Sequence, residues 1–350
     1  MRYPEFLKDG DTIGFCAPSF GCNTEPYRSR FDRALAVLAE EGYGILPGPN
    51  VYLGDGTGIS TAPEKCGKEF TELYCSDACR ALISCGGGEL MCEILKDVDF
   101  EAVRASEPKW FQGYSDNTNL VFTLTTLCDT AAIYGPCAPA FGMQPWHPAI
   151  RDSLMLLRGE KLESEGYARY EGDPYREKED PLEPYACTEE RMIVAWDPGT
   201  GRVSRRKALG FSGRLVGGCL DILATLCGTQ YDRAADFAER YRQDGIVWFL
   251  EACDLSVFGI RRALWQLKNA GWFRHVKGFL IGRPLAGREA LMGLDHIRAV
   301  TEPLAEFGVP ILLDVDIGHL PPMMPLISGS IATVRYAPAS GRFLLKMDLK

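Results

Sequence analysis

The sequence predicts a two-domain α/β protein with a mostly parallel sheet in its first part, and three observations lead there. Apolar strands alternate with helical stretches, the strands falling at Thr12 to Ala17, Ala81 to Ser84 and Trp110 to Gln112. This alternation is typical of βαβ units. The 350 residues exceed one domain of about 150. Residues 331–347 alternate apolar and polar side chains, as antiparallel strands do.

Helices and further strands are expected in the following order. Residues 25–42 have a helical rhythm of Phe31, Leu35 and Leu38, and further helices are predicted at 89–95 and 117–127. In the second part, 215–225 predicts a Gly-Gly start followed by an apolar helix. Strands at 246–251, 276–281 and 311–315 then alternate with an amphipathic helix at 257–270 and a later helix.

The middle of the chain differs in composition. Residues 160–190 hold eleven acidic and four basic residues, with three prolines and little apolar periodicity. This pattern indicates either a solvated connection or a lid over a site. We therefore expect an N-terminal α/β domain at 1–158, an acidic linker at 159–206 and a C-terminal α/β domain at 207–350.

Composition excludes several classes of protein. The formal net charge of −9 argues against a general nucleic-acid binder, which needs a basic face. No apolar run reaches the ~18 residues of a membrane span, and the N-terminal residues do not resemble a signal peptide. The thirteen cysteines and four histidines show no zinc-type spacing. The sequence thus predicts a cytoplasmic protein with reduced cysteines and no metal.

Four features could carry chemistry. Ser115 lies between a strand and a helix, with Gly113 two residues before it, which is the setting of a nucleophile elbow. Asn117 replaces the second Gly of that pattern, so Ser115 or Asp116 capping the next helix is an alternative. The second feature is the run Gly86, Gly87 and Gly88 after a strand, which is either an oxyanion or phosphate cradle or a plain turn.

The other two features are Glu251 and His319, each of which follows a predicted strand. Such strand ends are where sites form in open α/β sheets. A serine nucleophile needs a base, and the base needs an orienting carboxylate. The combination of Ser115, Glu251 and His319 is therefore more informative than each residue alone, and His147 is the one real rival for the base.

These motifs resemble the LD-carboxypeptidase family, which includes muramoyl-tetrapeptide carboxypeptidases and microcin C self-immunity proteins. The resemblance is carried by Gly113-Tyr114-Ser115-Asp116, the Gly-rich turn at 86–88, Leu215-Val216-Gly217-Gly218, Phe249-Leu250-Glu251 and Gly318-His319. It implies a flavodoxin-like N-terminal domain with the serine and a C-terminal swivelling α/β domain with Glu and His. The long acidic stretch looks more like the microcin-immunity branch.

The resemblance also implies site roles. Ser115 would be the nucleophile, His319 the base and Glu251 its orienting acid, with the backbone N–H groups of Asp116 and Gly87 as oxyanion hole. Substrate-binding candidates are Gly86, Gly88, Glu89 and Trp196, where Trp196 would stack on a nucleotide base or else pack within the protein. Two positions depart from the family pattern: Glu89 follows the Gly-rich turn, and Cys219 follows Gly217-Gly218.

The resemblance leaves the substrate open. It implies a serine peptidase that needs no cofactor, cleaving a terminal D-amino acid from a peptidoglycan-derived peptide or an amide bond in a peptidyl-nucleotide. Family members are commonly homodimers. The alternatives are a non-catalytic small-molecule binding or sensing module, and a cysteine-dependent enzyme for which Cys85 is the candidate.

Overall fold

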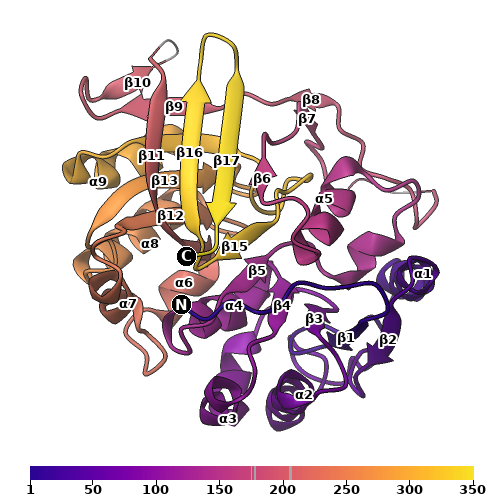
Figure 1. Ribbon diagram of the computed structural model, residues 1–350. Helices are drawn as coiled ribbons and strands as arrows, with labels where there is room; N and C mark the ends of the chain where they lie inside the picture. Colours follow the sequence, from indigo (N-terminus) through magenta and orange to yellow (C-terminus); the bar gives the residue numbers. More distant parts are fainter. Residues whose placement is uncertain (175, 177–178, 205–206) are drawn as a thin grey trace. The chain divides into compact units, whose positions relative to one another are not determined.

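The computed structural model describes residues 1–174, 176, 179–204 and 207–350 (Figure 1). The chain forms two compact units. Unit 1 comprises Met1–Lys161 and Tyr175–Pro184, and unit 2 comprises Leu162–Pro174 and Tyr185–Lys350. The acidic segment 159–206 thus contributes chain to both units.

A parallel sheet is the centre of unit 1. Its strands are β1 (Thr12–Cys16), β2 (Gly44–Pro47), β3 (Ala81–Ser84), β4 (Trp110–Gly113) and β5 (Ala132–Tyr134). They lie in the order β2-β1-β3-β4-β5, and each neighbouring pair is parallel. This is the flavodoxin-like order, in which ligands bind where the strand order reverses, beyond the carboxyl ends of β1 and β3. The predicted fold of this part is confirmed.

Helices connect these strands. They are α1 (Tyr27–Glu40), α2 (Pro63–Cys75), α3 (Phe100–Ala105), α4 (Thr118–Thr126) and α5 (Pro148–Leu157), with 3-10 turns η1 (Met91–Asp97), η2 (Ser115–Asn117) and η3 (Ala138–Gly142). The helix expected at 89–95 begins later, at Met91, and is a 3-10 helix. The reason is local: the N–H groups of Glu89 and Leu90 both donate to the Gly58 carbonyl, at 3.0 and 3.3 Å, which holds these two residues in a loop.

Unit 2 is built on a mixed sheet. Its nine strands lie in the order β10-β9-β14-β13-β12-β11-β16-β17-β6. The four central strands are parallel, and β9, β16 and β17 pair antiparallel on the two sides. In Figure 1 the final hairpin, β16 and β17, is drawn in yellow. The antiparallel end strands predicted for 331–347 are therefore confirmed.

The bounds of the unit 2 elements are as follows. The strands are β6 (Glu163–Ser164), β7 (Arg169–Tyr170), β8 (Glu189–Glu190), β9 (Val194–Asp197), β10 (Arg202–Ser204), β11 (Leu209–Cys219), β12 (Ile246–Glu251), β13 (Val276–Gly282), β14 (Ile311–Val315), β15 (Leu326–Ser328), β16 (Ile331–Ala337) and β17 (Arg342–Asp348). The helices are α6 (Leu220–Leu226), α7 (Ala234–Arg240), α8 (Val257–Asn269), α9 (His296–Leu304) and the 3-10 turn η4 (Ala305–Phe307).

The segment 215–225 differs from its prediction. The Gly-Gly pair does not start a helix but lies inside the long strand β11, and the helix begins only at Leu220. Gly217 pairs with Phe249 of β12, and a Cβ on Gly217 would collide with the Phe249 carbonyl oxygen. The glycine is therefore needed for close contact between two strands, a role that local sequence does not distinguish from a turn.

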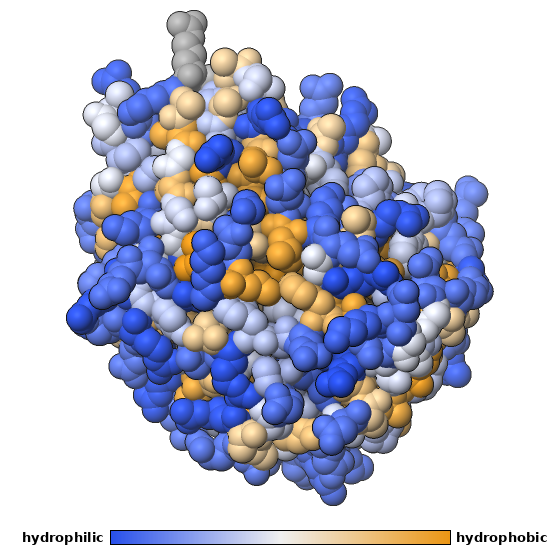
Figure 2. All heavy atoms as spheres, viewed as in Figure 1, coloured by the Kyte–Doolittle hydropathy of each residue, from blue (hydrophilic) through white to orange (hydrophobic). Residues whose placement is uncertain are grey.

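Surface and cysteines complete the description. Hydrophilic residues predominate on the face drawn in Figure 2, with apolar residues in small groups. Within the described residues, no helix is long and apolar enough to cross a lipid bilayer. The thirteen cysteines are all free thiols.

Candidate functional site

Ser115 sits at the turn that joins β4 to α4 in unit 1. Its backbone is left-handed, with a φ of 62°, a conformation that costs a non-glycine residue energy and that recurs at functional turns. The Ser115 N–H donates to the Tyr134 hydroxyl at 3.2 Å, and Tyr114 and Tyr134 pack edge to face. The structure thus has the strand, strained turn and helix that define a nucleophile elbow.

The side chain of Asp116 fastens the loops around this turn. Its Oδ2 accepts hydrogen bonds from the Ser19 hydroxyl at 2.6 Å and from the Met91 N–H at 2.9 Å. Burial raises the pKa of Asp116 to about 6, and the nearby charge of Glu89 acts in the same direction. The Asp116 carboxyl group therefore links the nucleophile turn to the loops that contain Ser19 and Met91. The group of Asp116 that remains for a chemical role is its backbone N–H.

The Gly-rich turn after β3 is next to Ser115. A Cβ on Gly87 would lie 3.1 Å from the Ser115 Oγ and 4.0 Å from the Asp116 nitrogen. A Cβ on Gly88 would collide with the Ser19 hydroxyl. The absence of a side chain at Gly88 therefore leaves room for the Ser19 hydroxyl, and a methyl at position 87 would crowd the Ser115 side chain. The structure brings together Ser115, Asp116 and residues 86–88, while the neighbouring Glu89 is exposed.

Glu251 and His319 form a pair in unit 2. Glu251 is buried and is the last residue of β12. His319 follows β14, a parallel strand that is separated from β12 by β13 alone. The Glu251 Oε2 lies 2.9 Å from the His319 Nδ1. Because a carboxylate only accepts, Nδ1 carries a proton, so the lone pair lies on Nε2 whenever the ring is neutral.

The environment of His319 favours its charged form. Burial by itself lowers the pKa of His319, but the charge of Glu251 and the hydrogen bonds that the ring makes to Cys253 and Glu251 outweigh burial and hold the pKa well above the usual value. Such a histidine is a stronger base than a free imidazole and forms a stable imidazolium after it takes a proton.

Glycine again permits a close approach. Gly318 has a φ of 101°, and a Cβ there would lie 2.5 Å from the Glu251 Oε2. Gly282, at the end of β13, would place a Cβ 2.9 Å from the Glu251 Cβ. The two glycines therefore make the space in which the carboxylate meets the imidazole.

Arg283 supports the His319 turn, and sequence reasoning missed it. Its guanidinium is buried, donates to the Asp316 Oδ1 at 2.7 Å and to the carbonyls of Asp314 and Leu320 at 3.1 and 3.3 Å. These bonds hold the chain on both sides of His319. The available signal was position, because Arg283 directly follows strand β13, at the same sheet edge as Glu251.

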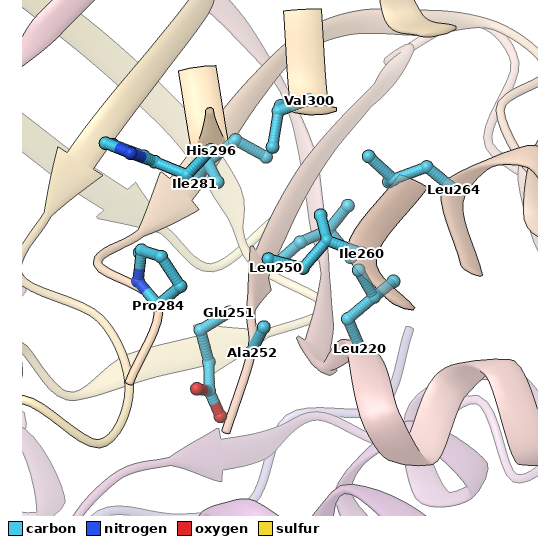
Figure 3. Close-up of a pocket in the computed structure, with 11 residues that line it drawn as sticks. Leu220, Leu250, Glu251, Ala252, Ile260, Leu264, Ile281, Pro284, His296 and Val300 are labelled. Carbon is cyan, nitrogen blue, oxygen red and sulfur yellow. The ribbon is translucent and has the colours of Figure 1, made fainter. Parts of the chain in front are cut away.

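Two further features border the Glu251 carboxyl group. Cys253 forms a side-chain hydrogen bond with His319, and it too was missed, although it lies two residues after Glu251. An apolar pocket also has Glu251 in its lining. Its lining includes Leu220, Leu264 and Val300, and in Figure 3 the Glu251 carboxyl points away from Leu264 and Val300. The aliphatic part of Glu251 thus borders the apolar pocket.

The remaining candidates lie as follows. Trp196 is in β9 of unit 2, where it pairs with Ile311 of β14, and its side chain is buried, with 6% exposed. His147 caps α5, its Nδ1 accepting from the Ala149 N–H at 3.1 Å. Burial raises the pKa of Cys85 well above its usual value, which makes it a poor nucleophile. No group of three metal-ligating side chains occurs within the described residues.

Each unit therefore carries groups of the kinds that acyl transfer uses. Unit 1 presents a hydroxyl on a strained turn with backbone amides around it, and unit 2 presents an imidazole backed by a buried carboxylate. These are the parts that amide hydrolysis through a covalent intermediate requires.

Comparison with known proteins agrees with this division. Family models for the LD-carboxypeptidase N-terminal domain and C-terminal domain match residues 13–135 and 212–334. The chain is 25% identical over 340 residues to the probable murein peptide carboxypeptidase of Bacillus subtilis, covering 95% of this chain and 92% of that protein.

Two comparisons concern another branch. The chain is 25% identical over 335 residues to the Microcin C7 self-immunity protein MccF of Escherichia coli, covering 92% of this chain and 90% of that protein. The solved structure of MccF in complex with aspartyl sulfamoyl adenosine superposes with a TM-score of 0.79 at 21% identity, covering 99% of this chain and 98% of that one. At this identity the structural likeness shows the fold alone.

Proposed function

The chain belongs to the LD-carboxypeptidase family, and we propose on that basis that it is a serine peptidase in which Ser115, His319 and Glu251 form a catalytic triad. The observation that carries the proposal is the 2.9 Å hydrogen bond between His319 and Glu251. A buried carboxylate directed at Nδ1 of a histidine on a Gly-shaped turn is the arrangement that makes Nε2 a base.

The proposed reaction begins with proton transfer. The His319 Nε2 takes the Ser115 hydroxyl proton as Oγ forms a bond to the substrate carbonyl carbon, and the carbonyl oxygen becomes an oxyanion. The N–H groups of Gly87 and Asp116 stabilise that oxyanion. The imidazolium then gives its proton to the departing amine, the C–N bond breaks, and an acyl-enzyme on Ser115 remains.

Water completes the cycle. His319 takes a proton from a water molecule, the hydroxyl oxygen attacks the acyl carbon, and collapse of the second tetrahedral intermediate returns the proton to Ser115. The products are a carboxylic acid and the free amine, so each turnover consumes one water. No cofactor enters these steps.

Two substrate classes follow from the relatives. A peptidoglycan-derived peptide matches the name of the probable murein peptide carboxypeptidase, and an aminoacyl sulfamoyl nucleotide matches the aspartyl sulfamoyl adenosine named for MccF. The proposal includes both amides as candidates. Glu89 is exposed beside the Gly-rich turn, and a carboxylate there disfavours close anionic groups.

The proposal extends to the state of the protein. The thirteen free cysteines fit the reducing cytoplasm, and a homodimer is in keeping with the family. Light scattering on the purified protein tests the dimer: a mass twice that of one chain supports it, and a single-chain mass contradicts it.

The decisive experiment measures turnover by mass spectrometry. The substrates are the peptide L-Ala-D-Glu-diamino acid-D-Ala and a peptidyl-sulfamoyl adenosine, each given to wild type, Ser115→Ala and the control Ser340→Ala, which alters an exposed turn serine in unit 2. Ser115-dependent loss of D-Ala identifies a peptidoglycan peptidase, and Ser115-dependent cleavage of the nucleotide conjugate alone identifies a detoxifying amidase. Binding of either compound without turnover would instead support a binding module.

A further inference from the structure

The carbonyl of Gly86 receives two side-chain hydrogen bonds. The Asn117 Nδ2 donates to it at 2.7 Å and the Ser84 hydroxyl at 3.0 Å. Both side chains belong to fully buried residues of unit 1. A carbonyl oxygen has two lone pairs, and at Gly86 two side-chain donors use them.

The anchored carbonyl constrains the next amide. In a planar trans peptide the C=O of Gly86 and the N–H of Gly87 point in opposite directions. The following peptide is fixed as well, because the Phe20 N–H donates to the Gly87 carbonyl at 2.9 Å. The orientation of the Gly87 N–H is therefore set by the residues that hold its two neighbouring carbonyls.

We propose that Asn117 and Ser84 are positioning residues that aim the Gly87 N–H at the oxyanion of the reaction on Ser115. The inference rests on the proposed function, and it goes further by assigning the geometry of the oxyanion hole to two side chains that touch neither substrate nor reacting atoms. Gly87 is adjacent to the nucleophile, since a Cβ there would lie 3.1 Å from the Ser115 Oγ.

The Asn117 side chain also makes a hydrogen bond within the nucleophile turn. Its Nδ2 also donates to the Tyr114 carbonyl at 3.0 Å, so one amide group joins the nucleophile turn to the Gly-rich turn. A Cβ on Gly113 would lie 2.6 Å from the Asn117 Cγ. Gly113 thus provides the space for this amide, and Asn117 occupies the position of the second glycine in the usual elbow pattern.

The buried oxygen of the same amide points to the same role. Within the described residues, the Asn117 Oδ1 is buried and has no hydrogen-bond partner. A buried polar atom without a partner calls for an explanation beyond packing. Here only the donor end is used, and both of its carbonyl acceptors belong to the turns that flank Ser115.

The test compares Asn117→Ala and Ser84→Ala with a matched control, Asn50→Ala. Asn50 is also a buried unit 1 asparagine whose Nδ2 donates to a backbone carbonyl, that of Lys65 at 3.2 Å. Loss of one oxyanion donor lowers kcat about 10²–10³-fold in other serine enzymes. We expect Asn117→Ala to approach that loss and Ser84→Ala to lose about 5-fold, equivalent to one hydrogen bond. KM should stay within about 3-fold in both.

Two further readouts separate positioning from folding. Ser84→Thr keeps the hydroxyl and should restore most of the rate lost in Ser84→Ala. Asn50→Ala should lower the melting temperature as Asn117→Ala does, while its kcat stays at the wild-type value. The rate of Ser115 labelling by a fluorophosphonate, whose phosphoryl oxygen also enters the oxyanion hole, should fall in the same order as kcat.

The outcomes distinguish this inference from the proposed function. If wild type turns over and is labelled at Ser115 while Asn117→Ala keeps its kcat and labelling rate, the positioning role is wrong and the proposed function stands. The positioning role is also wrong if Asn117→Ala changes only KM. It is wrong as well if Asn50→Ala lowers kcat as much as Asn117→Ala does. If wild type shows neither turnover nor Ser115 labelling, both the function and the positioning role are wrong.

Discussion

Glu69 makes the stability of unit 1 depend on pH. This α2 residue is 2% exposed, and its two carboxyl oxygens accept from the Ala17 N–H at 2.9 Å and the Asn50 N–H at 2.8 Å. Burial raises its pKa to about 7, against which the two hydrogen bonds act. Ala17 directly follows β1 and leads to Ser19, which binds Asp116 beside the nucleophile.

The sign and size of the effect follow from this pKa. The folded value of about 7 lies above the value of 4.5 for an unperturbed Glu, so the native state holds the proton over a range where the unfolded chain has lost it. The free energy of unfolding is therefore highest below pH ~4.5 and falls as pH rises through ~7. At about 1.4 kcal/mol for each unit between the two pKa values, the loss is about 3.5 kcal/mol.

Hydrogen exchange of the β1 amides, measured from pH 5 to 8.5 in wild type and Glu69→Gln, tests this. Glu69→Gln replaces one acceptor oxygen by an amide that faces an N–H, so it should be less stable at pH 5 by about 1–3 kcal/mol. It should also lack the decline that wild type shows on going to pH 8.5, so that the two curves converge. Parallel curves would refute the reasoning, because they would mean that Glu69 does not titrate in this range.

Three further predictions concern the site. Glu251→Gln should move the acid limb of the kcat/KM pH profile to lower pH, because the loss of the carboxylate charge lowers the pKa of His319. The same variant should lower kcat about 10²–10⁴-fold. An acid limb that does not move would mean that a group other than His319 causes it. Gly87→Ala, which puts a methyl 3.1 Å from the Ser115 Oγ, should lower kcat at least about 10-fold without lowering the melting temperature by more than a few degrees, as kinetics and calorimetry would show. Arg283→Ala should destabilise unit 2 by about 1.5–3 kcal/mol, because the buried Asp316 loses its 2.7 Å hydrogen bond from Arg283 and keeps Arg191 at 3.4 Å; an unchanged denaturation midpoint would contradict this.

Local patterns predicted most of the elements near the site. The strands at 81–84, 246–251 and 311–315 are apolar runs of strand length, and the structure has them at these positions. The helix at 257–270 was visible because its apolar side chains repeat with helical spacing, and it is α8. The Gly-Gly start predicted for 215–225 lies instead inside strand β11, where Gly217 allows close contact between two strands, and the predicted helix begins at Leu220.

The sequence also placed the candidate chemical groups at strand ends, from their order and spacing alone. Ser115 stands between strand and helix, Glu251 ends an apolar run, and His319 follows another strand on a Gly-Pro turn. These positions depend on short-range rules, since strand length and turn residues are properties of neighbouring residues in the chain. Family membership could be inferred in the same way, from motifs in a fixed order.

Only the tertiary structure decided which distant groups meet. The pair of Glu251 with His319 spans 68 positions, the contact of Asn117 with Gly86 spans 31, and that of Arg283 with Asp316 spans 33. Such contacts depend on strand order and register, which place the ends of β12, β13 and β14 at one sheet edge. The pKa of each buried group depends in turn on those contacts, because burial and charge act through space and not along the chain.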